Sequence, residues 1–117
     1  MFLTLTQVAI GGAIGSVLRY LTVFAVGAPL ATFLVNLSGS LAMGVLYVLL
    51  SRRAHLSPLL MTGVLGGFTT FSAFSLDAWK LWQSGQTPTA ALYIAGTVFL
   101  SLLAVALGAA LTERVLA

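Results

Sequence analysis

Polar side chains recur at a regular spacing inside stretches of this sequence that are otherwise apolar. One series is Thr32, Asn36 and Ser40, and the other is Thr89, Tyr93, Thr97 and Ser101. Side chains four residues apart lie on the same face of an α-helix, so each series predicts a polar stripe along one helix. Hydroxyl and amide groups can donate hydrogen bonds to a small anion that has lost its water. The structural alternative is that Ser and Thr bond to their own helix and Asn to a neighbouring helix.

The segment 63–74, which reads GVLGGFTTFSAF, carries the strongest signal in the chain. Its three glycines and its Thr-Thr pair are poor helix formers, so a break is expected within an otherwise apolar helix. A break would expose carbonyls that can bind a small cation and amides that can face an anion. Phe71 and Phe74 follow it on one helical face, and the edges of aromatic rings carry partial positive charge. The alternative is a flexible Gly-rich helix with ordinary core phenylalanines.

Arg19 is the only charged residue before Arg52. At 1.5 Å per residue, it lies roughly 12 Å before the Gly-Ala-Pro sequence at 27–29 that ends its predicted helix. An arginine at this position can anchor the helix by extending its head group to the membrane surface. It can also place a permanent positive charge at the mouth of an aqueous vestibule, where it would attract anions. No acidic residue precedes Asp77 to neutralise it, which favours an anion.

The composition identifies the environment in which these groups act. Of the 117 residues, 60% are hydrophobic and 6% are charged. Soluble domains carry about 25% charged residues, so this composition excludes a soluble enzyme, a nucleic-acid binder and a disordered tail. No nucleotide motif, carboxylate pair or metal-ligand cluster indicates enzymology. We therefore expect a membrane protein that is not an enzyme and binds no nucleic acid.

Charged residues are so sparse that they leave four long uncharged stretches. A spanning helix needs roughly 20 mostly apolar residues, so four transmembrane helices fit. Gly, Pro and polar residues predict turns between them at 27–29, 51–58 and 84–88. We expect an all-α membrane protein with a single four-helix domain over residues 1–117, its third helix broken near the middle. The helices are predicted at about 3–26, 30–50, 58–82 and 89–112.

The positive charges are nearly balanced across the membrane. With four spans, both termini and the middle connection share one side, which holds Arg52, Arg53 and Arg114. The other side holds Lys80, together with Arg19 if that residue is counted with the nearer end of its helix. Positive charge normally sets the direction of insertion, so this balance favours dual topology, with opposite copies paired as an antiparallel dimer. The alternative is a weakly biased protein whose orientation is fixed by other factors.

A chain of four helices is too small to line a pathway and also shield it from lipid. Small residues at positions i and i+4 let helices approach closely. Such pairs are Gly11 and Gly15, Ser40 and Gly44, and Gly63 and Gly67. Each pair alone is a weak signal, but together they favour an oligomer over a monomer.

These features together resemble the Fluc (CrcB) fluoride channels, a family of small dual-topology membrane proteins. The resemblance covers essentially the whole chain. It includes GGAIG at 11–15 with Arg19-Tyr20, the segment 32–44 around Val35-Asn36, and the specific run GGFTTFSAF at 66–74. The sequence departs from the family at Ala73, where the family usually has threonine, so one hydroxyl of the polar track is missing.

The resemblance implies an antiparallel homodimer with two separate pores, each using residues of both subunits. The main-chain carbonyls of Gly66 and Thr69 from both subunits would hold one structural sodium ion at the dimer axis. Phe71 and Phe74 would be the paired rings that line the pores, and Asn36 would be a pore donor.

The remaining implied roles are those of the polar track and the vestibule. Ser72 would belong to the polar track, and Arg19 would supply the vestibule charge. The other track residues would be Tyr93, Thr97 and Ser101.

The function that the resemblance implies is passive, fluoride-selective export of cytoplasmic fluoride by a multi-pass protein of the bacterial inner membrane. Its partners would be the fluoride ion, the lipid membrane and a second copy of the chain. A small multidrug-resistance-type proton-coupled transporter has a similar length and helix number, but it needs a titratable carboxylate inside the membrane. The only acidic residues, Asp77 and Glu113, lie near predicted helix ends. The second alternative is a non-transporting membrane assembly subunit held by its small-residue faces.

Overall fold

The computed structural model describes residues 1–117 and consists of helices joined by short connections. Four helices are long and apolar enough to cross a membrane, and they span Phe2–Val26, Leu30–Arg52, Ala54–Gln83 and Thr87–Leu116. This confirms the predicted all-helical architecture with four membrane spans. The predicted boundaries agree to within a few residues, and the largest differences are the earlier start of the third span and the later end of the fourth.

The four spans are built from eight helical elements. The short 3-10 turns η1 and η2 follow α2, and the π-helical segment η3 continues directly into α3. The elements are α1 (Phe2–Val26), α2 (Leu30–Leu49), η1 (Leu50–Arg52), η2 (Ala54–Leu56), η3 (Pro58–Leu65), α3 (Gly66–Phe68), α4 (Phe71–Gln83) and α5 (Thr87–Leu116).

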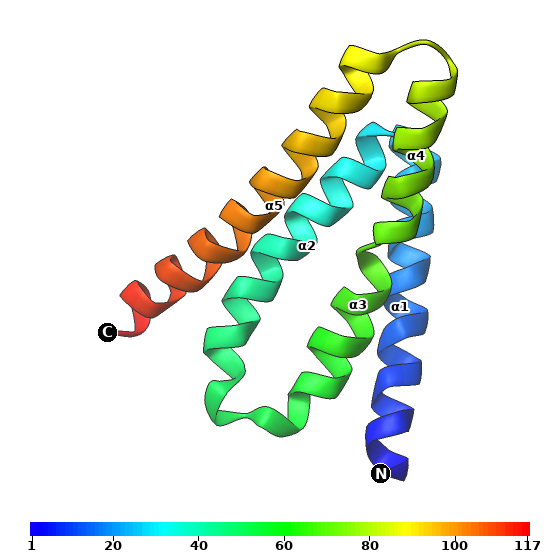
Figure 1. The fold of residues 1–117 in the computed structure, drawn as a ribbon. Coiled ribbons are helices and arrows are strands. Elements are labelled where there is room, and N and C mark those ends of the chain that lie inside the picture. Colours follow the sequence, from blue (N-terminus) through cyan, green and yellow to red (C-terminus); the bar gives the residue numbers. More distant parts are fainter.

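The chain passes back and forth along one direction (Figure 1). The N-terminus and the connection between α2 and η3 lie at one end, and the α1–α2 and α4–α5 connections lie at the other. Gly27 and Gly85 terminate helices at these last two connections with φ angles of 86° and 80°. Glycine adopts this left-handed region without steric cost, so the turns predicted at 27–29 and 84–88 have a local cause.

Glycines allow two pairs of helices to pack with their backbones in contact. The helix α1 packs along η3 and α3, and α2 packs along α5. A Cβ atom added to Gly15 would collide with the Val64 carbonyl oxygen, and one added to Gly44 would collide with that of Val105. The small-residue spacings are therefore used within one chain. The oligomer expected from this spacing stays a prediction.

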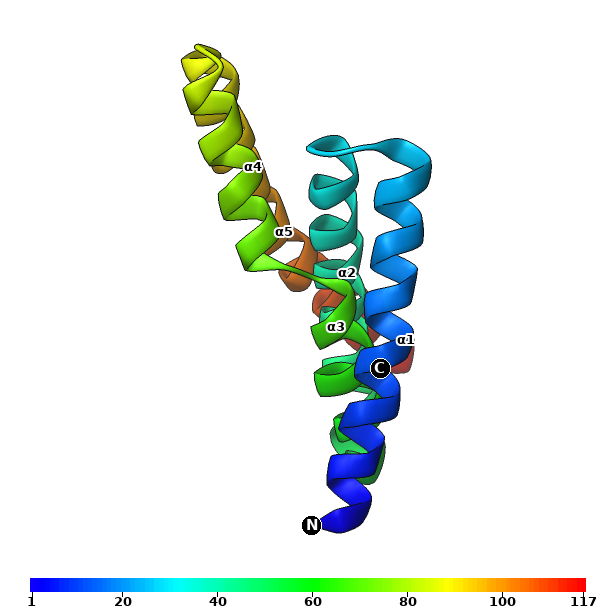
Figure 2. The same cartoon turned by 90° about the vertical axis from the view of Figure 1, so that its right-hand side faces the viewer.

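The third span consists of two helical segments joined by two extended residues. Helix α3 ends at Phe68, after which Thr69 has a ψ angle of 157°. Thr70 has φ and ψ angles of −154° and 119°, and α4 begins at Phe71. Beyond this point α4 is inclined away from α1 (Figure 2). The extended residues therefore set the direction in which α4 presents its side chains.

The exterior is apolar, and few polar side chains are buried. Large side chains such as Phe2, Phe24, Leu92 and Phe99 are exposed. This is expected where lipid tails rather than water surround the helices. The buried polar or charged side chains are Thr32, Asn36, Asp77 and Thr97.

Candidate functional site

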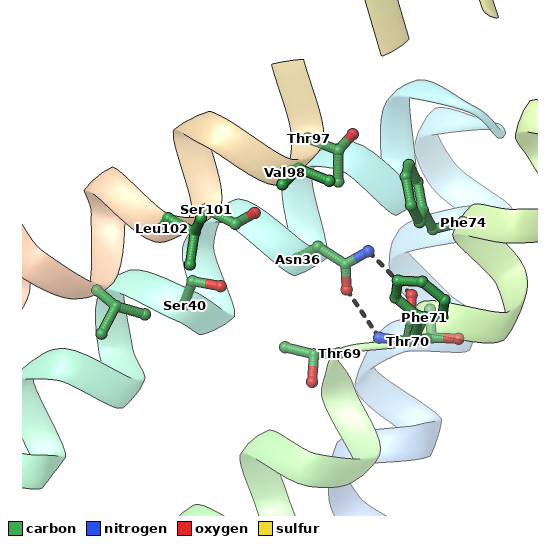
Figure 3. Close-up of a pocket in the computed structure, with 11 residues that line it drawn as sticks. Asn36, Ser40, Thr69, Thr70, Phe71, Phe74, Thr97, Val98, Ser101 and Leu102 are labelled. Carbon is green, nitrogen blue, oxygen red and sulfur yellow. Dashed lines mark hydrogen bonds between the residues drawn. The ribbon is translucent and has the colours of Figure 1, made fainter. Parts of the chain in front are cut away.

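An open groove of about 350 Å³ lies where α2, α4 and α5 meet the extended residues of the third span. Its lining is polar on α2, aromatic on α4 and mixed on α5, and no acidic or basic side chain takes part (Figure 3). The lining residues are Asn36, Ser40, Thr69, Thr70, Phe71, Phe74, Thr97, Val98, Ser101, Leu102 and Val105. We call this the central groove.

Asn36 pairs with the backbone of Thr70 through both ends of its side-chain amide (Figure 3). Its Oδ1 accepts a hydrogen bond from the Thr70 N–H at 2.7 Å, and its Nδ2 donates to the Thr70 carbonyl at 3.0 Å. A side-chain amide offers the same donor and acceptor as a peptide group, so it can satisfy a residue that has left the helix. One of the two Nδ2 hydrogens remains for a ligand in the central groove.

Two hydrogen bonds of a continuous third helix are replaced by bonds to side chains. In such a helix the Thr70 N–H would donate to the Gly66 carbonyl, and the Ala73 N–H would donate to the Thr69 carbonyl. Instead, Asn36 accepts from the Thr70 N–H, and the Thr70 hydroxyl accepts from the Ala73 N–H at 3.1 Å. The carbonyls of Gly66 and Thr69 thereby lose their regular helical donors.

Two hydroxyls on α5 lack hydrogen-bond partners. Thr97 Oγ1 and Ser101 Oγ are both buried and unpaired, and both side chains line the central groove. Leaving a buried polar group unpaired costs about 1–3 kcal/mol. Rotation of either hydroxyl toward an acceptor in the groove would relieve this cost.

Phe71 and Phe74 form an edge-to-face pair on the first turn of α4. Their ring centroids are 5.5 Å apart, with an interplanar angle of 64°. Phe74 is 6% exposed and its ring lies 5.3 Å from that of Tyr93, whereas Phe71 is 77% exposed. Phe74 is thus fixed by packing, and Phe71 stands at the open side of the groove. Their positively polarised edges can contact an anion.

Most of the residues expected at a site line the central groove, and the others lie outside it. Those that line it are Asn36, Thr69, Phe71, Phe74, Thr97 and Ser101. Ser72 is not among the residues that line the groove, although its hydroxyl lies 3.3 Å from that of Thr70. The Tyr93 hydroxyl donates to Asp77 Oδ2 at 3.3 Å instead of facing the groove. Gly66 is exposed next to the groove without lining it.

Arg19 lies at a second groove, on the side of the α1–α2 connection. Arg19 Nε donates to the Gly67 carbonyl at 3.0 Å, which fixes the guanidinium beside the third span. We call this second groove the outer groove. Asp77, Lys80 and Ala73 also line it. The methyl group of Ala73 therefore replaces the expected threonine at the outer groove and leaves the central groove unchanged.

The family described as CrcB-like protein, Camphor Resistance (CrcB), matches residues 6–109. The chain belongs to this family. It is 53% identical over 112 residues to a protein from Paracoccus denitrificans, with 90% of each chain covered. It is 50% identical over 109 residues to one from Cereibacter sphaeroides, with 87% of this chain and 88% of the relative covered. Both relatives are named fluoride-specific ion channel FluC, which is not the name of an enzyme class.

A more distant CrcB-family relative carries the same name. The protein from Saccharophagus degradans is 43% identical over 116 residues, with 92% of this chain and 87% of the relative covered. The family resemblance seen in the sequence is confirmed. Together with the four apolar helices, it identifies this CrcB-family chain as a multi-pass protein of the bacterial inner membrane.

Sequence reasoning missed the partners of two site residues. It did not connect Asn36 with Thr70. The Thr-Thr pair at the expected helix break was a usable signal, because a backbone that leaves the helix needs other hydrogen-bond partners. It placed Asp77 only near a predicted helix end, whereas the carboxylate accepts a hydrogen bond from Tyr93 on α5. The partner itself lies on another helix in both cases, so the pattern of one helix could not identify it.

Proposed function

We propose that this protein is a fluoride-selective ion channel that exports cytoplasmic fluoride passively, down its electrochemical gradient. The observation that carries this proposal is the central groove, which combines an amide, two unpartnered hydroxyls and aromatic edges without a carboxylate. Fluoride is small and strongly hydrated, so a pore must replace its water with donors that are numerous and individually weak. The names of the relatives support fluoride as the ion.

The working unit that we propose is an antiparallel homodimer with two pores, each built from both subunits. The central groove is open, and Phe71 at its rim is 77% exposed, so one chain leaves the pathway unshielded from lipid. A second copy in the opposite orientation would close the groove. The nearly balanced positive charges support this arrangement, because they give little preference for one direction of insertion.

We also propose a structural sodium ion between the two copies, held by the main-chain carbonyls of Gly66 and Thr69. Carbonyl oxygens are ligands for hard cations. These two carbonyls lack their regular helical donors because side chains have taken the N–H groups of Thr70 and Ala73. Gly66 is exposed and Thr69 half-buried in the single chain, so both are available to a site shared with a second copy.

Fluoride efflux from liposomes that contain only the purified protein tests the channel directly. The vesicles are loaded with potassium fluoride or potassium chloride, and release is followed with ion-selective electrodes after a potassium ionophore is added. We expect rapid fluoride release and negligible chloride release. Folded protein that releases no fluoride, or that releases both anions equally, would contradict the proposal.

Replacement of sodium by N-methylglucamine during purification should lower both thermal stability and fluoride flux. A cation too large for the carbonyl site cannot bridge the two subunits, so the dimer loses a contact at its axis. Thermal unfolding in detergent and the liposome assay measure the two effects. Restoring sodium should reverse both, and equal behaviour in the two salts would remove the sodium ion from the proposal.

A further inference from the structure

We propose that Asn36 and Thr70 are positioning residues, whose side chains create the sodium site by keeping Thr69 and Thr70 in an extended, non-helical conformation. The inference rests on the proposed sodium site and assigns its construction to residues that do not themselves bind the ion. Asn36 accepts a hydrogen bond from the Thr70 N–H, which would otherwise donate to the Gly66 carbonyl. The Thr70 hydroxyl accepts one from the Ala73 N–H, which would otherwise donate to the Thr69 carbonyl.

Each of these two hydrogen bonds to a side chain leaves one main-chain carbonyl without its helical donor. A carbonyl that already accepts a helical hydrogen bond is a poorer ligand, because part of its lone-pair density is directed to the donor. The Thr70 N–H and the Ala73 N–H are the donors that an intact helix would direct at Gly66 and Thr69. Both are instead held by side-chain oxygens, at 2.7 Å and 3.1 Å.

The packing of α2 brings Asn36 to the extended residues in a fixed position. Val35 is 1% exposed and Ala31 is 0% exposed, so this part of α2 cannot rotate without disturbing the core. A Cβ atom added to Gly39 would collide with Cγ2 of Thr69, which shows how closely α2 approaches the third span. The Asn36 amide is therefore preorganised to pair with Thr70.

Asn36 also lines the central groove, so one side chain connects the cation site with the proposed anion pathway. Its Oδ1 and one Nδ2 hydrogen hold Thr70, and the other Nδ2 hydrogen is left for the groove. Loss of the cation would release the extended residues and with them the orientation of this donor. The arrangement gives a physical reason for a channel that conducts anions to depend on a bound sodium ion.

The test measures how much sodium each variant needs for thermal stabilisation. The intact protein is purified in N-methylglucamine and titrated with sodium, and the midpoint of the stability increase is recorded. We expect Asn36→Ala and Thr70→Val to raise this midpoint at least about tenfold, the scale on which outer-shell partners affect metal affinity. Thr70→Ser keeps the hydroxyl and should retain the wild-type midpoint.

Ser38→Ala is the matched control on α2. The Ser38 side chain is exposed, and its hydroxyl donates to the Leu34 carbonyl of its own helix. Its sodium midpoint should be unchanged. If Asn36→Ala does not fold, the comparison of Thr70→Val with Thr70→Ser still decides the question.

Hydrogen exchange provides a second measurement that does not depend on transport. Sodium should slow amide exchange in the peptide containing residues 66–73 of the wild type, and this slowing should be lost in Asn36→Ala and Thr70→Val. Variants that are less stable in both salts but keep the wild-type sodium midpoint would show a purely structural role and overturn the inference. A wild type with fluoride flux but no sodium response would instead remove the sodium site and leave the channel proposal intact.

Discussion

Replacement of Phe71 or Phe74 by isoleucine is expected to reduce fluoride flux by about two- to tenfold while the protein remains folded. An edge-to-face contact between two rings is worth about 0.5–1.5 kcal/mol beyond its buried area, and we take the same range for a ring edge that contacts the anion. A rise of about 1.4 kcal/mol in the barrier slows conduction tenfold. Isoleucine keeps an apolar surface but has no positively polarised edge. Fluoride efflux from liposomes, normalised to the amount of folded protein, measures the effect.

Phe99→Ile is the control for the aromatic pair. Phe99 is 70% exposed on α5 and lines neither groove, so its replacement removes an aromatic ring without affecting the proposed pathway. Its flux should match that of the wild type. Wild-type flux in both Phe71→Ile and Phe74→Ile would show that the rings do not line the pathway.

Gly15→Ala is expected to prevent correct folding or to lower stability by about 1–3 kcal/mol or more, the usual cost of overpacking. The added methyl group would meet the carbonyl oxygen of Val64 and the backbone nitrogen of Phe68, the latter at 2.8 Å. Both atoms belong to backbone, so no side chain can rotate to make room. The helix α1 would have to separate from the third span.

Gly12→Ala distinguishes this steric effect from a general loss of glycine in α1. A Cβ atom at Gly12 has nothing within 4 Å. Alanine also has the higher helix propensity, by about 1 kcal/mol, so this variant should be at least as stable as the wild type. Yield of monodisperse protein and thermal unfolding in detergent measure both variants. Equal stability of the two would contradict the close packing of α1 on the third span.

The sequence alone determined the number of membrane spans and the positions of the turns. Both depend on local properties, namely the length of the apolar stretches and the backbone preferences of Gly27 and Gly85. The sequence also predicted which residues of α5 form a polar face, because helical spacing is a property of one helix. Thr97 and Ser101 of that face line the central groove.

Only the tertiary structure decided what these faces contact. The pairing of Asn36 with Thr70 joins residues 34 positions apart, and it depends on the rotation of α2 about its axis. The same holds for Tyr93, whose hydroxyl faces Asp77 instead of the groove although it shares the α5 stripe. Helical periodicity defines a face but does not identify its neighbour, since that depends on how all four spans pack together. The glycine spacings are the clearest example. They predicted that helices approach closely, but only the packing shows that the approaching helices belong to the same chain.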